Sequence, residues 1–254
     1  QLTLGIFLPL RFYEGDMSVL AGQADLVSEL DRLGFAATWV RDVPLYDPSF
    51  GDAGQVFDPF TYLAYLAYLA ARTKQIALVT GSAIFTLRHP IDLAKAAATL
   101  DQLSGGRLVM GIASGDRPIE FPAYGLEHGE RGERFAHSVD YFRQLLQARP
   151  TAIQSALGSL SDAQLLPKPV TGRIPLIVTG RSQQSMQWLG TQADGWLTYP
   201  DSTQDRRGPQ RLAERIRTWR SSIPGGGFRP HMTNEWIDLA EDPNFPRTPL
   251  RGGY

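Results

Sequence analysis

The chain has 254 residues, with 25 Lys and Arg against 26 Asp and Glu, so its formal net charge is −1. This balance, without a polybasic or acidic tail, argues against nucleic acid as a partner. The absence of cysteine excludes disulfides, thiolate metal ligands and a cysteine nucleophile.

Membrane and export signals are also missing from the sequence. No apolar run approaches the ~18 residues of a membrane span. The chain starts directly on a strand-like apolar stretch, with no basic segment before it. We therefore expect a cytoplasmic protein that does not enter a membrane.

Short apolar stretches alternate with amphipathic stretches along the chain. We expect strands over 2–8, 37–40, 76–79, 108–112, 175–179, 195–199 and 232–239. We expect helices over 18–33, 58–72, 90–103, 133–147, 182–192 and 210–221. The segments 41–57, 116–132 and 149–173 read as long loops or irregular chain.

This alternation predicts a parallel α/β sheet with right-handed crossovers. A (β/α)8 TIM-type barrel of ~250 residues fits the length best. We find seven strands and no eighth, and a barrel one strand short would leave an open edge. We therefore expect residues 1–254 to be a single barrel domain that lacks its eighth strand and terminal helix, with a natural chain that continues further.

Two expected strands end in small residues. One strand runs into Thr80-Gly81-Ser82-Ala83 and the next into Ala113-Ser114-Gly115. Small residues let a ligand approach the backbone, and α/β folds bind ligands at the carboxyl ends of their parallel strands. The first segment is equally consistent with a tight strand-to-loop turn.

A third strand end carries Gly180-Arg181-Ser182, followed by Ser185. We expect Ser182 to be the N-cap of the next helix, whose free N–H groups, together with Arg181, would suit a phosphate. The alternative is an ordinary helix start with a solvated arginine.

The helix over 58–72 is apolar almost all round. Such a helix is buried on more than one side. It is either sandwiched within the domain or packed against a second subunit, and we favour a homodimer.

Together, several phrases resemble the bacterial-luciferase-like flavin-dependent monooxygenase family, within an uncharacterised luciferase-type oxidoreductase subgroup. The phrases are LGF..TWV at 33–40, DPF at 58–60, RHP.....AAATLD.LSGGRL..GI..G at 88–115, EF..YG at 120–125, R..RF at 131–135, LLPKPVTGRIPLIVTGRSQQS at 165–185 and ADGW at 193–196.

The resemblance implies reduced FMN at the carboxyl mouth of a barrel, dioxygen, a separate flavin reductase and a small-molecule substrate. It also implies a bulge with a non-proline cis peptide near Gly81-Ser82. The residues expected at the cofactor are Thr80, Gly81, Ser82, Ser114, Gly180, Arg181, Ser182 and Ser185.

Other positions near the expected mouth carry weaker expectations. Asp42 or Arg41 is a candidate for contact with flavin or substrate, whereas Val43-Pro44 stands near the place where the luciferases proper carry a catalytic histidine. The sequence therefore assigns no catalytic residue, and light emission is not expected. An apolar rim for the substrate is expected from Phe7, Phe12, Tyr13, Phe85 and Phe121.

The remaining charged and histidine residues read as structural. We expect Glu120 and Arg134 to form an ion pair, and His89 to cap or pack at a helix start. The other histidines, His128, His137 and His231, lack the spacing of a metal site.

Two other functions remain open. One is hydride transfer with the deazaflavin coenzyme, whose larger tail would need a basic groove from Arg11, Arg41 and Arg181. The other is a non-catalytic protein that stores flavin.

Overall fold

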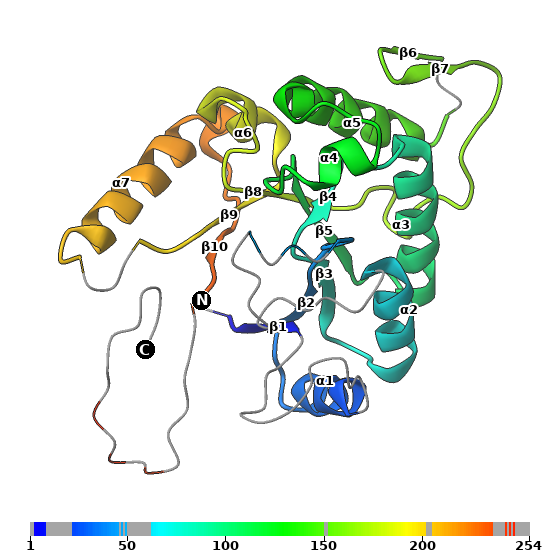
Figure 1. Ribbon diagram of the computed structural model, residues 1–254. Helices are drawn as coiled ribbons and strands as arrows, with labels where there is room; N and C mark the ends of the chain where they lie inside the picture. Colours follow the sequence, from blue (N-terminus) through cyan, green and yellow to red (C-terminus); the bar gives the residue numbers. More distant parts are fainter. Residues whose placement is uncertain are drawn as a thin grey trace. The chain divides into compact units, whose positions relative to one another are not determined.

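The computed structural model describes residues 3–8, 22–45, 47, 49, 62–149, 152–201, 205–235, 242, 244 and 246. It divides into two compact units, Gln1–Leu176 and Ile177–Tyr254. Each unit combines parallel strands with helices (Figure 1). Of the helices in the described ranges, none has the length and apolar character needed to traverse a bilayer.

The first unit is built on a parallel sheet whose strands pair in the order β1-β2-β3-β5, with the short β4 also paired to β5. The strands are β1 (Gly5–Leu8), β2 (Ala37–Val40), β3 (Ala77–Thr80), β4 (Ala83–Ile84) and β5 (Leu108–Ala113). In register, Val40 faces Thr80 across β2 and β3, and Val79 faces Val109 across β3 and β5. Because all strands run the same way, their carboxyl ends gather at one edge.

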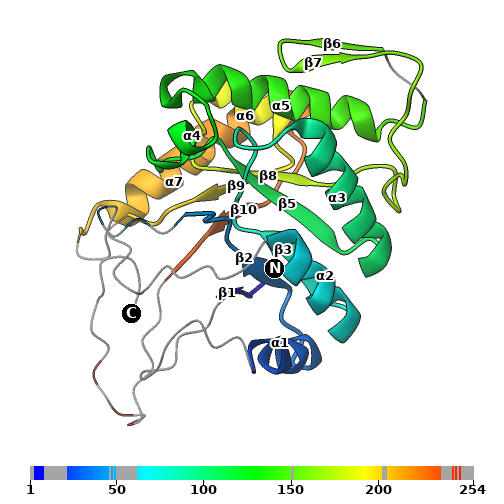
Figure 2. The same cartoon turned by 45° about the vertical axis from the view of Figure 1, so that its right-hand side comes forward.

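Helices follow the strands of this unit, and the longer ones, such as α3 and α5, bury apolar residues along one side. They are α1 (Gln23–Arg32), α2 (Tyr62–Arg72), α3 (Pro90–Ser104), the short α4 (Glu120–Ala123), the 3₁₀ turn η2 (His128–Glu130) and α5 (Arg131–Leu146). In Figures 1 and 2, α2 lies beside α3, and α3 beside α5. The core between helices and sheet includes the fully buried Leu66, Leu78, Leu93 and Phe142.

The SGGRL phrase has a structural explanation in Arg107. Gly105 ends α3 with φ +68°, a conformation that glycine adopts without strain. The guanidinium of Arg107 then donates to the carbonyl oxygens of Ala70 (2.9 Å), Thr73 (3.2 Å) and Ile76 (2.9 Å). One side chain therefore satisfies the end of α2 and the approach to β3.

The segment expected to be irregular, 149–173, contains an antiparallel hairpin of β6 (Ile153–Ser155) and β7 (Gly158–Leu160). The expected loop 116–132 likewise contains α4 and η2. Both expectations were wrong in these parts, because the segments are too short and too polar to show a period.

The second unit carries a parallel sheet in the order β8-β9-β10. Its elements are β8 (Leu176–Thr179), α6 (Met186–Gln192), β9 (Gly195–Thr198), α7 (Gly208–Ser221), the 3₁₀ turn η3 (Pro224–Gly226) and β10 (His231–Thr233). Trp196 of β9 and Trp219 of α7 pack with ring centroids 5.5 Å apart. Hence each of the seven expected strands has a counterpart, although residues 236–239 of the last lie outside the described residues.

The apolar helix α2 shows a buried and an exposed side within this chain. Tyr65, Leu66 and Leu69 are buried, whereas half of Tyr68 is exposed. The helix is therefore not sandwiched on all sides by the described residues, and a subunit contact stays a prediction.

Candidate functional site

The cis peptide expected after β3 is confirmed at Gly81-Ser82. It lies between β3 and β4, which pair successively with β5 and so form the expected bulge. A Cβ atom on Gly81 would lie 2.5 Å from Cε1 of Phe7 and 3.1 Å from Cε3 of Trp39. Glycine is therefore required here by the close approach of two aromatic rings.

Those two rings form an apolar surface at the carboxyl ends of β1 and β2. Phe7 and Trp39 are stacked, with centroids 5.3 Å apart and planes inclined by 25°. Phe7 is half-buried and Trp39 is buried. Of the residues expected to form an apolar rim, Phe7 belongs to this surface, whereas Trp39 was not among them.

The neighbouring hydroxyl groups differ in what they can offer a ligand. The Thr80 side chain is fully buried and its hydroxyl donates to the carbonyl oxygen of Gly111 at 2.6 Å. By contrast, the hydroxyl of Ser114 has no hydrogen-bond partner among the described residues, although its backbone oxygen accepts from Thr86 Oγ1 at 3.0 Å. Ser82 is half-buried. Thr80 can therefore offer a ligand only its backbone, whereas the Ser114 hydroxyl has its hydrogen-bonding capacity left.

Asp42 is held firmly within the first unit. Arg88 donates Nη1 to Oδ2 at 2.6 Å and Nη2 to Oδ1 at 2.8 Å, and the backbone N–H of Ile84 donates to Oδ2 at 2.8 Å. The carboxylate is buried, so this paired guanidinium is what allows the charge there. The geometry shows Asp42 bracing the loop after β2 against β4.

The second unit places the Gly180–Ser185 segment at the carboxyl end of β8. Helix α6 begins at Met186, and its N-cap is Ser185, whose hydroxyl accepts from the N–H of Trp188 at 3.1 Å. The expectation that Ser182 caps the helix was wrong. Ser182 and Gln183 instead adopt left-handed conformations, with φ +46° and +62°, in a turn that precedes the helix.

Arg181 stands exposed on this turn. Its Nε donates to the carbonyl oxygen of Gln184 at 3.1 Å, which holds the side chain against its own turn. Neither terminal nitrogen has a partner among the described residues. Ser182 Oγ is occupied differently, since it donates to the carbonyl oxygen of Thr179 at 2.9 Å. Arg181 therefore keeps two guanidinium nitrogens available for an anion.

Three expectations about aromatic and charged residues were wrong. Phe85 and Phe121 are fully buried, so they belong to the core and not to a rim. Arg134 donates to the carbonyl oxygen of Thr86 at 2.7 Å, and the ion-pair partner of Glu120 is Arg117, with Nε 3.2 Å from Oε1. Arg11, Phe12 and Tyr13 lie outside the described residues.

The histidines have structural surroundings where the structure describes contacts. His89 caps α3, accepting from the N–H of Ile91 at 3.2 Å, as expected. His231 Nε2 lies 2.9 Å from Thr198 Oγ1, and burial, followed by the nearby charges of Arg220 and Arg215, lowers the pKa of His231 to about 4. Across the described ranges, no three His, Cys, Asp or Glu residues gather in a way that could hold a metal ion.

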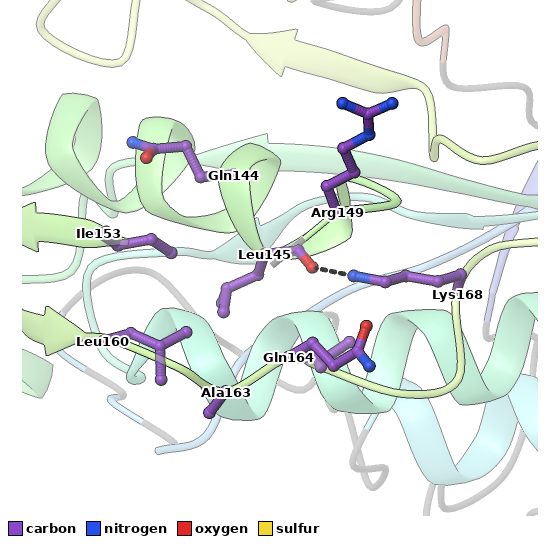
Figure 3. A pocket seen from close by; sticks show the side chains of 9 residues that line it. Gln144, Leu145, Arg149, Ile153, Leu160, Ala163, Gln164 and Lys168 are labelled. Atoms are coloured by element: carbon purple, nitrogen blue, oxygen red, sulfur yellow. Dashed lines mark hydrogen bonds between the residues drawn. The ribbon is translucent and has the colours of Figure 1, made fainter. Parts of the chain in front are cut away.

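A small hollow lies apart from these residues. It lies between the end of α5, the β6–β7 hairpin and the segment 163–168. In Figure 3, Lys168 reaches across it to the carbonyl oxygen of Leu145, a bond of 2.9 Å. None of the predicted cofactor residues lines it, so we do not assign it to the site.

Comparison with known proteins places these features in a family. A family model described as luciferase-like monooxygenase matches residues 2–223. The 4-hydroxyprotoasukamycin monooxygenase of Streptomyces nodosus subsp. asukaensis is 31% identical over 184 residues, covering 70% of this chain and 47% of that protein. An F420-dependent glucose-6-phosphate dehydrogenase of Amycolatopsis mediterranei (strain U-32) is 28% identical over 183 residues, covering 69% and 53%.

Among solved structures, the oxygenating constituent of 3,6-diketocamphane monooxygenase of Pseudomonas putida, in complex with FMN, has a TM-score of 0.72 and 17% identity. The match covers 94% of this chain and 68% of that one. This likeness confirms the predicted α/β fold of the (β/α)8 type. The chain spans about half the length of the curated relatives it matches.

Proposed function

Because the chain belongs to the luciferase-like monooxygenase family, we propose that it is a flavin-type oxidoreductase, and specifically a two-component monooxygenase. It would use reduced FMN, delivered by a separate reductase, and dioxygen to oxidise a small organic substrate. The observation that carries this proposal is the family match over residues 2–223, a range that contains every residue proposed for the cofactor.

The described residues fit a flavin in two respects. Arg181, whose two terminal guanidinium nitrogens bond to none of the described residues, suits the phosphate group. The stacked Phe7 and Trp39 beside Gly81, with the unpaired Ser114 hydroxyl on β5's carboxyl side, suit the flat and partly polar ring system. Gly180, Ser182, Ser185, Ser82 and the backbone of Thr80 complete the proposed set.

The division of labour follows from this set. The bound reduced flavin supplies the electrons that activate dioxygen. The residues of the chain bind the phosphate, orient the ring and keep an apolar surface against it, which limits access of water. The proposed homodimer would cover the exposed side of α2 around Tyr68.

A second candidate is hydride transfer with the deazaflavin coenzyme F420. It is favoured by the F420-dependent relative, which matches 69% of this chain at 28% identity. Arg41 and Arg181 would then face a longer anionic tail. The two candidates share the family and the phosphate site, and differ in the coenzyme.

Anaerobic titration of the purified protein with reduced and oxidised FMN, and with both forms of F420, separates the candidates. We expect selective binding of reduced FMN. Preference for F420 would replace the monooxygenase by the hydride-transfer function, and binding without substrate-coupled oxygen consumption or hydride transfer would leave a flavin-storage protein.

The phosphate assignment is tested with Arg181→Ala. Losing a hydrogen bond to a charged group costs ~1.5–3 kcal/mol, so the dissociation constant should rise roughly ten- to hundred-fold. The matched control is Arg217→Ala, which removes an exposed arginine of the same unit. An unchanged dissociation constant in Arg181→Ala, or an equal rise in the control, removes Arg181 from the site.

A further inference from the structure

Glu120 is a carboxylate enclosed by protein at the start of α4. Its side chain has no exposed surface, and neither oxygen accepts a hydrogen bond from the described residues. An isolated buried charge of this kind is unfavourable unless a cation compensates it. What faces Glu120 therefore decides its charge.

Four charged groups surround Glu120 electrostatically: Arg117 and Asp116 of the same loop, Asp42 after β2 and Arg88 before α3. Arg88 is committed to Asp42 through two hydrogen bonds. Arg117 is the cation in ion-pair contact with Glu120, at 3.2 Å. The imidazole of His128 packs edge-on against the next residue of α4, Phe121, with centroids 4.8 Å apart.

Arg117 also reaches a different loop. Its Nη2 donates to the backbone oxygen of Leu45 at 3.1 Å, and its side chain is 5% exposed. The guanidinium thus connects the loop after β5 to the loop after β2. Both loops follow the carboxyl ends of strands, where the cofactor residues of this unit lie.

We propose that Glu120 is a positioning residue that acts through Arg117: as a carboxylate it holds the guanidinium against Leu45, and as a neutral acid it releases that contact. Residues 41–45, which follow β2, are then fastened at high pH and loosened at low pH. The proposal does not depend on which cofactor the protein uses.

The electrostatics place this change near neutrality. Burial raises the pKa of Glu120 to about 7, with Arg117 opposing the shift and Asp42 and Asp116 adding to it. Asp116 is exposed, so the enclosed partners of Glu120 are Arg117 and the Asp42–Arg88 pair. The contact with Leu45 should therefore change over a pH range in which the fold itself persists.

Hydrogen exchange of the cofactor-free protein from pH 5.5 to 8.5 tests the proposal. The exchange rates of the backbone amides of Asp42, Val43 and Leu45 are measured. Each is expressed as a protection factor, relative to the intrinsic exchange rate of an unstructured amide at the same pH. Because a hydrogen bond to a charged group shifts a local equilibrium by roughly tenfold, protection should rise by about that factor, with its midpoint near the pKa of Glu120.

Glu120→Gln should remove this stepwise rise of protection with pH and leave the three amides weakly protected at every pH. The control Glu127→Gln changes an exposed carboxylate of the same segment and should keep the wild-type step. A wild-type protein without a step, or a step that persists in Glu120→Gln, overturns the proposal.

A direct titration keeps the proposal testable if Glu120→Gln fails to fold. Carboxyl ¹³C NMR of the wild-type protein should show one glutamate titrating near neutral pH. If every glutamate titrated near the usual pKa of 4.5, the raised pKa of Glu120 would be rejected.

Discussion

The loop after β5 and the turn after β8 both carry an arginine, yet the two side chains are used in opposite ways. Arg117 is buried beside Glu120 and donates to the backbone oxygen of Leu45, so its guanidinium is engaged within the protein. Arg181 is exposed and, among the described residues, is bonded only through Nε, so its terminal nitrogens remain available. Burial, more than residue type, therefore separates a side chain that shapes a site from one that can bind a ligand.

Asp42 and Arg88 are a second case in the first unit of charged side chains that bind each other instead of being available to a ligand. Each carboxylate oxygen of Asp42 accepts from a different guanidinium nitrogen, and Oδ2 also accepts from a backbone N–H. Breaking such a pair leaves the other charge uncompensated, which costs more than the pair contributes. Substitutions in this part should therefore affect stability before they affect binding.

The largest effect is expected for Asp42→Asn. Removing one partner of a buried pair costs ~3–5 kcal/mol, and the Arg88 side chain is only 24% exposed, so solvent gives it limited relief. Urea unfolding measures the loss. The matched control is Asp25→Asn, which removes an exposed pair with Arg72 and should cost less than ~1 kcal/mol. Equal losses in both variants would place Asp42 with the surface pairs.

A smaller and pH-dependent effect is expected for Glu120→Gln. Because burial raises its pKa from 4.5 to about 7, the folded protein retains a proton that the unfolded chain releases in this range. The stability contributed by Glu120 is full below the lower value and lost as the pH rises through the higher one. The variant should therefore gain up to about 3 kcal/mol relative to the wild type between pH 4 and pH 8.

Paired urea titrations at the two pH values measure this difference, since the other titrating groups are shared by both proteins. A difference between variant and wild type that does not change with pH would contradict the raised pKa. In that case the hydrogen bond from Arg117 to the backbone oxygen of Leu45 would be a structural contact that does not depend on pH.

The strands could be predicted from the sequence because their apolar runs are continuous, as in Leu108–Ile112. The β6–β7 hairpin could not, since its strands have three residues each and carry little apolar pattern. The start of α6 was misplaced by three residues because Ser182 and Ser185 are equally good caps in sequence. Only the left-handed backbone at Ser182 and Gln183 distinguishes them.

The segments predicted for the candidate site follow the carboxyl ends of β3, β5 and β8, as the sequence indicated, but their role at a cofactor stays a prediction and the use of each side chain could not be foreseen. Thr80 was expected at the flavin, yet its hydroxyl turns to the carbonyl of Gly111. The Arg117–Glu120 pair was missed because Arg117 lies before α4, where an i, i+3 spacing does not by itself bring two side chains together. Whether Phe121 faces a mouth or a core depends on Ile84 and Leu87, which pack against it from a distant part of the chain and which local pattern does not reveal.

The smallest stability effect is expected for Arg181→Ala. The side chain is exposed and makes one hydrogen bond, to the carbonyl oxygen of Gln184, within its own turn, so the free energy of unfolding should change by less than ~0.5 kcal/mol. Its loss of cofactor affinity should nevertheless be the larger of the two measured effects. Arg181→Lys, which keeps the charge but not the forked geometry, should recover part of that affinity. A variant that loses stability and affinity together would show that Arg181, like Arg117, serves the fold.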